Sequence, residues 1–264
     1  MDISIPVQEA LRAGTSTGNT FTLAAGQLDP KLYKQVDAVL QTLGGKWQRA
    51  KKLHLFRKGV DAGALITEAL DKGEVKTQRE QQKEDGWFPT PEAVCVIVRD
   101  KLAALLPGTP HRLLEPSAGE GHLAQGVGDG HDWTLIERDA GRYAILDKAD
   151  FVRPVMRVEG DFLGIKPEAT GVFDGVVMNP PFAQPGKPQA FAEHIDHALK
   201  FVRPGGVLLA IAPSGLTFHE KGASARLRGV LAELGATIEP LPEGAFKVSG
   251  TAVATVLVSV RLPE

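Results

Sequence analysis

Residues 176–183 of the chain read VVMNPPFA, an apolar run that stops at an asparagine and two prolines. Neither Pro180 nor Pro181 has a backbone N–H to give to a β-ladder, so a strand must end just before them. A short, continuously apolar run is typical of a strand buried on both faces of a sheet. We therefore predict a central strand over 173–179 that ends where the sheet opens onto a ligand.

Further segments of this kind lie on both sides of the central strand and alternate with helical patterns. We expect strands at 111–119, 133–138, 155–162, 205–213, 236–241 and 251–260. We expect helices at 91–106, 189–202 and 220–234 and near 140–148. This alternation predicts an α/β fold with a doubly wound, Rossmann-like, mostly parallel sheet and one antiparallel strand near the C-terminus.

The first part of the chain has a different organisation. Strands are expected at 19–26 and 46–56 and helices at 30–44 and 60–73, and residues 74–86 are highly charged and nearly free of aliphatic side chains. We predict a small α+β domain with its linker over residues 1–85, and a larger domain over residues 86–264.

Composition narrows the class of protein. The only cysteine among the 264 residues is Cys95, which excludes a disulfide framework and a four-thiolate metal site, and favours the reducing cytoplasm. The N-terminus lacks the pattern of a signal peptide, and no apolar run approaches the roughly 20 residues that cross a bilayer. His194 and His197 lack further ligands at metal-binding spacing, so we expect ordinary histidines and no metal.

Charge is unevenly distributed along a chain whose net charge is −2. Residues 1–85 contain 13 Lys/Arg and 11 Asp/Glu, a net of +2, and residues 31–58 contain eight basic side chains and a single acid, Asp37. Such a stretch can contact phosphates, or it can be an ordinary solvated surface. Both interpretations remain open at this point.

The first strand end of the larger domain carries a glycine turn, LEPSAGEGH at 114–122. Its small residues let the backbone pass close to a ligand. The spacing does not fit the dinucleotide pattern G-x-G-x-x-G, and Glu115 would repel a pyrophosphate. A carboxylate at this position suits a cationic ligand instead.

Two more acids follow at the next two predicted strand ends. Glu137 comes 22 residues after Glu115, a spacing at which an acid accepts ribose hydroxyls. Asp161 can accept an adenine amino group, and Phe162 can lie against the adenine ring. A ligand with a positive centre, a ribose and an adenine fits all three acids, and S-adenosylmethionine is such a ligand.

These motifs together resemble the class I S-adenosylmethionine-dependent methyltransferases, and more narrowly the gamma-type enzymes that methylate adenine N6 in DNA. The likeness rests on Glu115–Gly121, on Asn179–Phe182 and on the preceding Trp87–Pro91 element, in the family's order, and it covers 86–264. The whole chain also resembles phage- and prophage-type methyltransferases with a small N-terminal region. The element around Thr90 and Pro91 is equally a common helix start, with Thr as N-cap and Pro at the first helical position.

The resemblance implies a role for each matched residue. Glu137 would bind the cofactor's ribose, and Asp161 and Phe162 its adenine. The residues that would hold its methionine part, with those beside them, are Phe88, Thr90, Glu115, Ser117, Ala118, Gly119, Gly121 and Asn179.

Chemistry suggests what the Asn-Pro-Pro-Phe motif does. The lone pair of an exocyclic amine is delocalised into its ring, so the enzyme must hold both N–H groups and turn the lone pair towards the methyl carbon. The Asn179 side-chain oxygen can accept one N–H and the Pro180 carbonyl the other, while Pro181 fixes the backbone. Phe182 offers a ring face to the target base, and Phe246 is either a second stacking ring or a core residue.

The motif does not name the polymer that is methylated. Methylation of DNA adenine N6 is the leading hypothesis, and methylation of an RNA base or a protein glutamine is the second. A nucleic-acid-binding module with a vestigial pocket is the third. Gamma-type DNA enzymes usually carry a target-recognition domain after the catalytic part, and this chain ends at its last strand. We therefore expect recognition to come from residues 1–85, a second copy or a partner, with Lys46, Arg49, Lys51 and Lys52 on phosphates.

Overall fold

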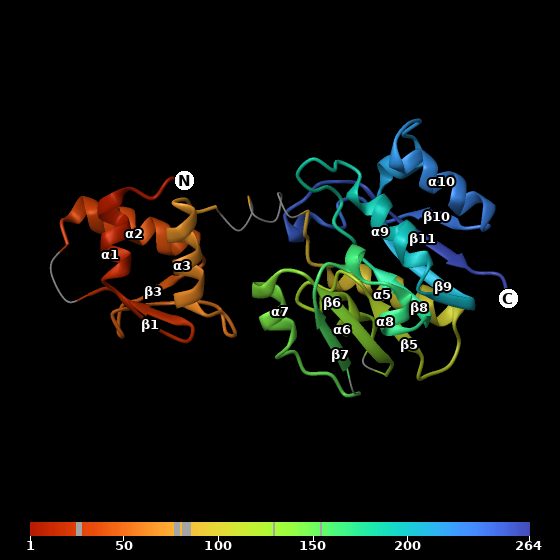
Figure 1. Cartoon of the computed structure of the whole chain (residues 1–264), viewed down its shortest axis with the longest axis horizontal. Helices are drawn as coiled ribbons and strands as arrows, with labels where there is room; N and C mark the ends of the chain where they lie inside the picture. The colour runs from red at the N-terminus through yellow and green to blue at the C-terminus, as the bar shows by residue number, and fades with distance from the viewer. Residues whose placement is uncertain (25–27, 77–79, 81–85, 129, 154) are drawn as a thin grey trace. The chain divides into compact units, whose positions relative to one another are not determined.

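The computed structural model describes residues 1–24, 28–76, 80, 86–128, 130–153 and 155–264 (Figure 1). The chain forms two compact units, Met1–Lys83 and Glu84–Glu264. We call them unit 1 and unit 2 and describe each by itself.

Unit 2 is built on a seven-stranded sheet with the order β10-β11-β9-β8-β5-β6-β7. Its strands are β5 Arg112–Glu115, β6 Asp132–Glu137, β7 Val155–Glu159, β8 Phe173–Met178, β9 Val202–Pro213, β10 Thr237–Pro240 and β11 Thr255–Arg261. Strands β5 to β9 pair in parallel, whereas β11 runs antiparallel to both of its neighbours. This confirms the predicted mostly parallel sheet with one antiparallel strand near the C-terminus.

Helices cover both faces of this sheet (Figure 1). They are α5 Glu92–Leu105, α6 His122–Val127, α7 Ala140–Leu146, α8 Pro167–Thr170, α9 Ala190–Leu199 and α10 Ala223–Glu233, with short 3-10 turns η1 Phe162–Gly164, η2 Ser214–Thr217 and η3 Lys247–Ser249. The predicted start of α5 is wrong by one residue: Pro91 is the N-cap rather than the first helical residue. Thr90 is thereby released from the capping role that the sequence suggested.

The buried strands divide their side chains between two cores, because successive residues of a strand point to opposite faces. The core on the side of α5 and α6 contains Leu113, Leu135, Val177 and Leu209. The core on the side of α9 and α10 contains Leu114, Ile136, Val176 and Leu208. Each central strand is therefore apolar at consecutive positions, as the VVM run is.

The strand order reverses between β5 and β8. From β5 the chain proceeds to β6 and β7 in one direction, and it then crosses back to β8 and β9 on the other side. In open α/β sheets ligands bind at such a reversal, outside the carboxyl ends of the strands. The glycine turn follows β5 and the Asn-Pro-Pro-Phe motif follows β8, so the topology brings the two motifs to this point.

Unit 1 is a small α+β structure with a four-stranded antiparallel sheet, ordered β1-β2-β4-β3. Its elements are α1 Ile5–Arg12, β1 Thr15–Thr17, β2 Thr20–Thr22, α2 Pro30–Thr42, β3 Lys46–Gln48, β4 Leu53–Leu55 and α3 Ala62–Lys72. The sequence correctly predicted α2 and α3. Asp29 caps α2 through its side chain, and Gly73 ends α3 in the left-handed conformation.

Two predictions for unit 1 were wrong. Residues 46–56 are not one strand but a hairpin of β3 and β4, whose turn places Lys52 at φ 53°, a conformation that is uncommon for a residue other than glycine. The predicted linker also starts too early, because Val75 is buried in the core of unit 1 and exchanges backbone hydrogen bonds with Met1. Residues 77–79 and 81–85 of that linker lie outside the described residues.

No helix in the described part of the chain is long and apolar enough to cross a membrane.

Candidate active site

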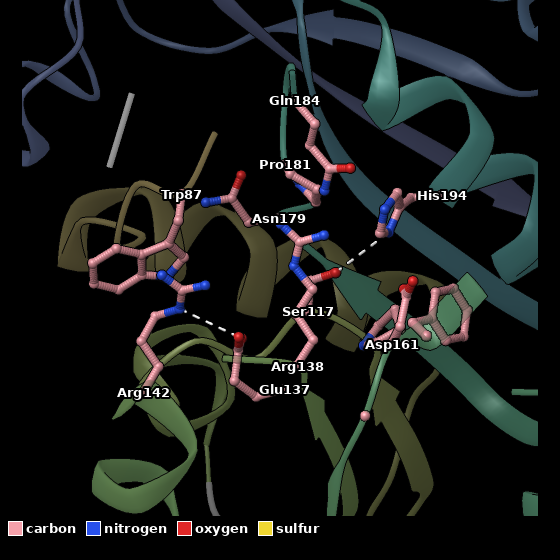
Figure 2. A pocket seen from close by; sticks show the side chains of 13 residues that line it. Trp87, Ser117, Glu137, Arg138, Arg142, Asp161, Asn179, Pro181, Gln184 and His194 are labelled. Carbon is pink, nitrogen blue, oxygen red and sulfur yellow. Dashed lines mark hydrogen bonds and ion pairs between the residues drawn. The ribbon is translucent and has the colours of Figure 1, made fainter. Parts of the chain in front are cut away.

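A pocket opens at the strand-order reversal of unit 2 (Figure 2). Its lining comes from the segments that follow β5, β6, β7 and β8, from α9 and from the chain just before α5. The lining residues are Trp87, Pro116, Ser117, Glu137, Arg138, Arg142, Gly160, Asp161, Phe162, Asn179, Pro181, Gln184 and His194. A smaller adjoining pocket shares Trp87, Ser117 and Asn179, and it is also lined by Phe88, Pro89, Thr90, Glu115, Ala118, His122 and Leu123. Most of the predicted cofactor residues therefore lie together.

Asn179 is held in one orientation by the segment before α5. Its side-chain Nδ2 donates to the carbonyl oxygen of Phe88 at 3.0 Å and to Oγ1 of Thr90 at 3.1 Å. A backbone carbonyl can only accept, so the NH₂ end of the amide must face Phe88. The other end, Oδ1, is left without a partner among the described residues. Asn179 lines both pockets, and its oxygen is the group that remains for a ligand.

The segment that holds Asn179 is itself anchored. The Ser249 hydroxyl, at the end of η3, donates to the carbonyl oxygen of Pro89 at 2.6 Å. Thr90 is buried beneath Asn179. The Phe-x-Thr-Pro element thus fixes the asparagine amide, a role for Thr90 that its sequence pattern did not reveal.

The glycine turn after β5 approaches other atoms too closely for any side chain. Gly119 has φ +57°, and a Cβ added to it would lie 2.3 Å from Trp87 Nε1. Gly121 has φ +88°, and its Cβ would lie 2.9 Å from Leu146 Cδ1. Gly119 is thus required both by conformation and by space, and Gly121 by its conformation.

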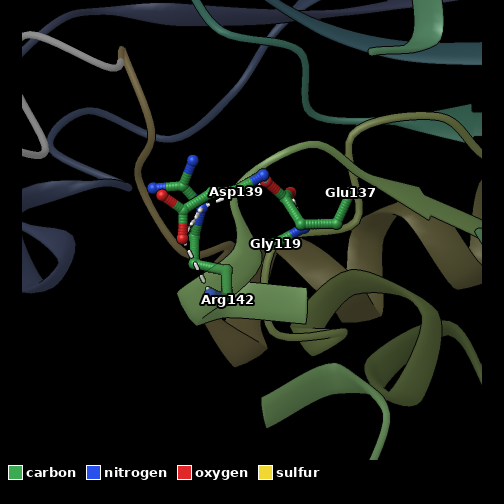
Figure 3. A network of polar contacts seen from close by, with 4 residues as sticks. All are labelled: Gly119, Glu137, Asp139 and Arg142. Carbon is green, nitrogen blue, oxygen red and sulfur yellow. Dashed lines mark hydrogen bonds and ion pairs between the residues drawn. The ribbon is translucent and has the colours of Figure 1, made fainter. Parts of the chain in front are cut away.

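Glu137 is the centre of a polar network at the end of β6 (Figure 3). Its Oε2 accepts from the backbone N–H of Gly119 at 2.7 Å. Its Oε1 accepts from the N–H of Asp139 at 2.8 Å and from Arg142 Nε at 3.2 Å. The Arg142 guanidinium also lies 5.1 Å from the ring centroid of Trp87. A carboxylate has about four lone-pair sites. The Glu137 carboxylate already accepts three hydrogen bonds, so about one site remains for a ligand.

Glu115 lies deep in the smaller pocket. Its Oε2 accepts from the backbone N–H of Ala124 at 3.0 Å, so the carboxyl caps the first turn of α6. Burial raises the pKa of Glu115 well above its usual value, and the nearby Glu137 charge acts in the same direction, while the Ala124 hydrogen bond opposes it. A cationic ligand nearby would favour the ionised form again.

Asp161 and Phe162 follow β7 as predicted, and both line the pocket. The Asp161 side chain caps η1 by accepting from the N–H of Leu163 at 3.1 Å. The ring of Phe162 is buried in the core, with ring centroids 4.7 Å from His197 and 5.0 Å from Phe201. Phe162 therefore supports the pocket wall from behind rather than offering an open face.

The residues expected to bind the methyl-accepting base are partly buried. Pro181 lines the pocket, whereas Pro180 and Phe182 are buried. The Phe182 ring lies between Phe88, at 6.4 Å, and Phe246, at 6.2 Å. Phe246 is fully buried, so of its two alternatives the structure favours the core residue. For Phe182 to meet a target base, these rings must separate.

His194 is the main pocket residue whose position the sequence did not reveal. The sequence suggested an ordinary histidine at the surface or at an edge, but His194 is 4% exposed, and its Nδ1 lies 3.5 Å from Ser117 Oγ. Burial lowers its pKa to about 4, an effect that Arg138 adds to and the Asp161 charge opposes. The imidazole is thus neutral at pH 7. The sequence did contain a signal for this burial, because His194 lies at helical spacing from Phe191 and Ala198, which are buried apolar residues of α9.

Trp87, Arg138, Arg142 and Gln184 also line the pocket, and sequence reasoning assigned none of their side chains a role. The sequence did offer a signal that Trp87 lies near the site, because Trp87 directly precedes the Phe-x-Thr-Pro element. Arg142 lies five residues after Glu137, on the first turn of α7, and only the fold shows that it faces back onto that acid. Gln184 belongs to a turn that closes on Lys187 after the Pro-Pro motif.

The four basic residues expected on phosphates belong to unit 1. Lys46 is on β3, and Arg49, Lys51 and Lys52 form or border the hairpin turn; all four are exposed. None forms an ion pair with a described residue. Elsewhere in the described chain there is no group of three or more His, Cys, Asp or Glu side chains arranged to hold a metal ion.

Comparison with known proteins found no matching family model and no matching curated protein. Solved structures do match. One is described as a class I S-adenosylmethionine-dependent methyltransferase from Listeria monocytogenes, with 15% identity, 77% of this chain and 67% of that chain covered, and a TM-score of 0.54.

Two others belong to restriction–modification systems. A type I methyltransferase subunit from Streptococcus thermophilus has 17% identity and a TM-score of 0.55, covering 88% of this chain and 53% of that one. A type I modification subunit from Vibrio vulnificus has 18% identity and a TM-score of 0.53, covering 76% and 48%. This chain thus spans about half the length of either subunit. At these identities the likeness establishes the architecture: unit 2 has the fold of the class I S-adenosylmethionine-dependent methyltransferases.

Proposed function

We propose that the chain transfers a methyl group from S-adenosylmethionine to an exocyclic amino nitrogen, with adenine N6 in DNA as the leading target. The observation that carries this proposal is the orientation of Asn179. Phe88 and Thr90 bind the amide's NH₂ end, which leaves a neutral oxygen acceptor facing the pocket. A neutral acceptor is what a weakly nucleophilic amine needs, because it holds an N–H without competing for the methyl group.

The pocket residues fit the proposed cofactor. Glu137 would bind the ribose, Asp161 the adenine amine, and Ser117, Ala118 and the Gly119–Gly121 backbone the methionine part. Since three hydrogen bonds already use the Glu137 carboxylate, a second ribose hydroxyl would displace Arg142. Arg142 would then be held by its contact with the Trp87 ring.

When bound, S-adenosylmethionine supplies an electrophilic methyl group on a positively charged sulfur. The chain aligns the amine with it. Asn179 Oδ1 accepts one N–H and the Pro180 carbonyl accepts the other, which directs the nitrogen lone pair at the methyl carbon. As the new N–C bond formed, the bond from the methyl carbon to sulfur would break and its electron pair would stay on the sulfur, which becomes a neutral thioether. The positive charge would then build on the nitrogen, where the two acceptors would stabilise it. The N–H proton then leaves to water, so no strong base is required.

Two observations favour DNA as the polymer. Among the solved structures of similar fold are modification subunits of type I restriction systems. In addition, the exposed hairpin residues Lys46, Arg49, Lys51 and Lys52 supply positive charge for a phosphate backbone. An RNA base or a protein glutamine would present the same amino group to Asn179, and a vestigial pocket would bind ligand without transfer.

The test is parallel transfer of tritium from labelled cofactor to DNA, RNA and total protein. We expect label in DNA that digestion releases as N6-methyladenine. Label confined to RNA or protein would select the second hypothesis, and cofactor binding with no transfer to any polymer would select the third.

The matched variants are Asn179→Ala and Asn179→Asp, with cofactor affinity measured beside transfer. We expect Asn179→Ala to lower transfer by about 10²–10³-fold, as loss of one stabilising group at a reaction centre does. Asn179→Asp keeps an acceptor oxygen but forces a carboxylate against the Phe88 carbonyl, so it should also fail. Normal transfer by either variant would contradict the proposed role of the amide.

A further inference from the structure

We propose that Trp47 is a base-stacking platform through which unit 1 binds single-stranded nucleic acid. This deepens the proposed function, on which it rests only for the choice of nucleic acid as the partner. The platform consists of Trp47 on β3, the rings of Tyr33 and His54 that support it, and the basic hairpin around it.

Charge defines the kind of partner. Residues 38–60 contain six basic side chains, Lys46, Arg49, Lys51, Lys52, Arg57 and Lys58, and no acid. The two acids that flank this range both accept hydrogen bonds. Asp37 Oδ1 lies 2.8 Å from His54 Nε2 and its Oδ2 accepts from Gln41 at 2.6 Å, while Asp61 caps α3. The hairpin's own cations, Lys46, Arg49, Lys51 and Lys52, are exposed and form no ion pair with a described residue, so this surface is positive, which suits a polyanion.

The fold leaves Trp47 uncovered. Trp47 pairs with His54 across the hairpin, and His54 pairs with Phe21 on the next strand, so the three side chains share one face of the sheet. His54 and Phe21 are buried under the helices. Because β3 is the edge strand, Trp47 lies at the rim of this core, and 40% of it remains exposed.

The exposed ring is also held in place. Its centroid lies 5.0 Å from His54, tilted by 54°, and 6.4 Å from Tyr33, which meets it edge-on at 85°. The Asp37 contact fixes the His54 ring in turn. An aromatic that is already immobilised loses little conformational entropy when a base stacks on it.

A rigid, exposed aromatic ring on a hairpin with exposed cations is the combination by which proteins bind single strands: cations follow the backbone and bases stack on the ring. A duplex differs, because its bases already stack on one another and offer no free face. The platform therefore predicts that Trp47 contributes to single-strand binding and contributes little to duplex binding.

The experiment measures the affinity of the full chain for a 15-nucleotide oligo(dT) and for a duplex of the same length, by fluorescence anisotropy. We expect Trp47→Ala to weaken oligo(dT) binding by about 5- to 150-fold and Trp47→Phe, which keeps a ring, by much less. Duplex affinity should change less than about threefold in both variants.

Leu55→Ala is the matched control. Leu55 is 38% exposed on the same hairpin and pairs with Lys46, so it faces the opposite side of the sheet from Trp47. Leu55→Ala should leave both affinities unchanged.

Equal losses for oligo(dT) and duplex in Trp47→Ala would overturn the platform, as would oligo(dT) affinity equal to that of the unmodified chain. Polyglutamate that competes as well as oligo(dT) would also overturn it, because the surface would then recognise charge alone.

Two further measurements separate stacking at Trp47 from effects on folding and on catalysis. Should Trp47→Ala fold poorly by circular dichroism, quenching of tryptophan fluorescence by oligo(dT), present in the unmodified chain and lost in Trp47→Phe, decides the matter. All binding is measured without cofactor and repeated in Asn179→Ala. A platform that binds while transfer to DNA is absent would refute the proposed function alone, and transfer to DNA without stacking at Trp47 would refute the platform alone.

Discussion

The pocket of unit 2 and the hairpin of unit 1 hold their polar side chains in opposite ways. In the pocket, Glu137 accepts three hydrogen bonds and Asn179 donates two, so each functional group has one orientation. On the hairpin, Lys51 and Lys52 are exposed and have no ion pair with any described residue. A fixed constellation suits a small ligand of defined shape, whereas unpaired cations on a surface suit a polymer whose backbone can shift.

The contrast also explains where substitutions should matter. Each pocket residue is coupled to several others, so a single change should disturb the whole constellation. Each hairpin cation should act nearly alone. The largest effect is therefore expected in the glycine turn of the pocket.

Gly119→Ala should abolish cofactor binding, lowering affinity more than about 100-fold. The new Cβ would lie 2.3 Å from Trp87 Nε1 at a backbone φ of +57°, and the turn would have to move away from Glu137. Calorimetric titration with S-adenosylmethionine measures the loss. Gly130→Ala is the control, because a Cβ there meets no described atom within 4 Å. Comparable binding by both variants would show that the turn is not fixed.

His194→Gln should reduce the loss of stability that acid causes. Burial lowers the pKa of His194 from 6.5 to about 4, so the unfolded chain binds the proton more readily between these values. His194 thus contributes stability above pH 6.5 that is lost as the pH falls towards 4. From pH 7 to 4.5 the native chain should lose about 2 kcal/mol more than His194→Gln.

Urea unfolding of unit 2, followed by tryptophan fluorescence at both pH values, measures this difference. Glu115 acts in the opposite direction, because burial raises its pKa, but it is present in both proteins and cancels in the comparison. His197→Gln, on the same helix, serves as a control for loss of an imidazole. An identical pH dependence in His194→Gln and the unmodified chain would contradict the burial of His194 as a neutral ring.

The sequence predicted the positions of the strand ends better than the arrangement of the side chains around them. Strand ends are marked locally: continuous apolar runs stop at Glu115, Glu137 and Asn179, and sheet topology brings those ends together. Arg142 and Trp87, in contrast, meet across 55 residues of chain, and no local pattern encodes that contact. His194 faces inward because of how α9 packs, which composition alone does not specify.

The hairpin of unit 1 was missed for a related reason. Turns are usually marked by Gly, Asn, Asp or Pro, and residues 49–52 read RAKK. The alternation of basic and apolar residues on either side therefore looked like one long strand. The pairing of β3 with β4 forces Lys52 into a positive φ that its own preference opposes.

Thr90→Val should lower the rate of transfer about tenfold while leaving the fold intact. Valine keeps the shape of Thr90 but cannot accept the hydrogen bond from Asn179 Nδ2, so the amide loses one of its two anchors. Single-turnover transfer to the polymer that the tritium experiment identifies is the measurement. Thr134→Val is the control, because Thr134 is also a buried threonine but lies within β6. This variant should transfer normally. An unaffected rate in Thr90→Val would mean that the Phe88 carbonyl alone positions the amide.

The smallest effect is expected on the hairpin, where Lys51→Ala should weaken oligonucleotide binding only a few-fold. Its signature is the salt dependence: if Lys51 contacts one phosphate, the slope of log K against log salt should fall by about 1. Lys72→Ala is the matched control, because Lys72 is an exposed lysine of the same unit whose charge is already paired with Glu68 at 2.5 Å. An equal change of slope in both variants would mean that general charge, rather than an unpaired cation, governs binding. The hairpin would then be no more specialised for a polymer than the rest of the surface of unit 1, and the contrast with the pocket would disappear.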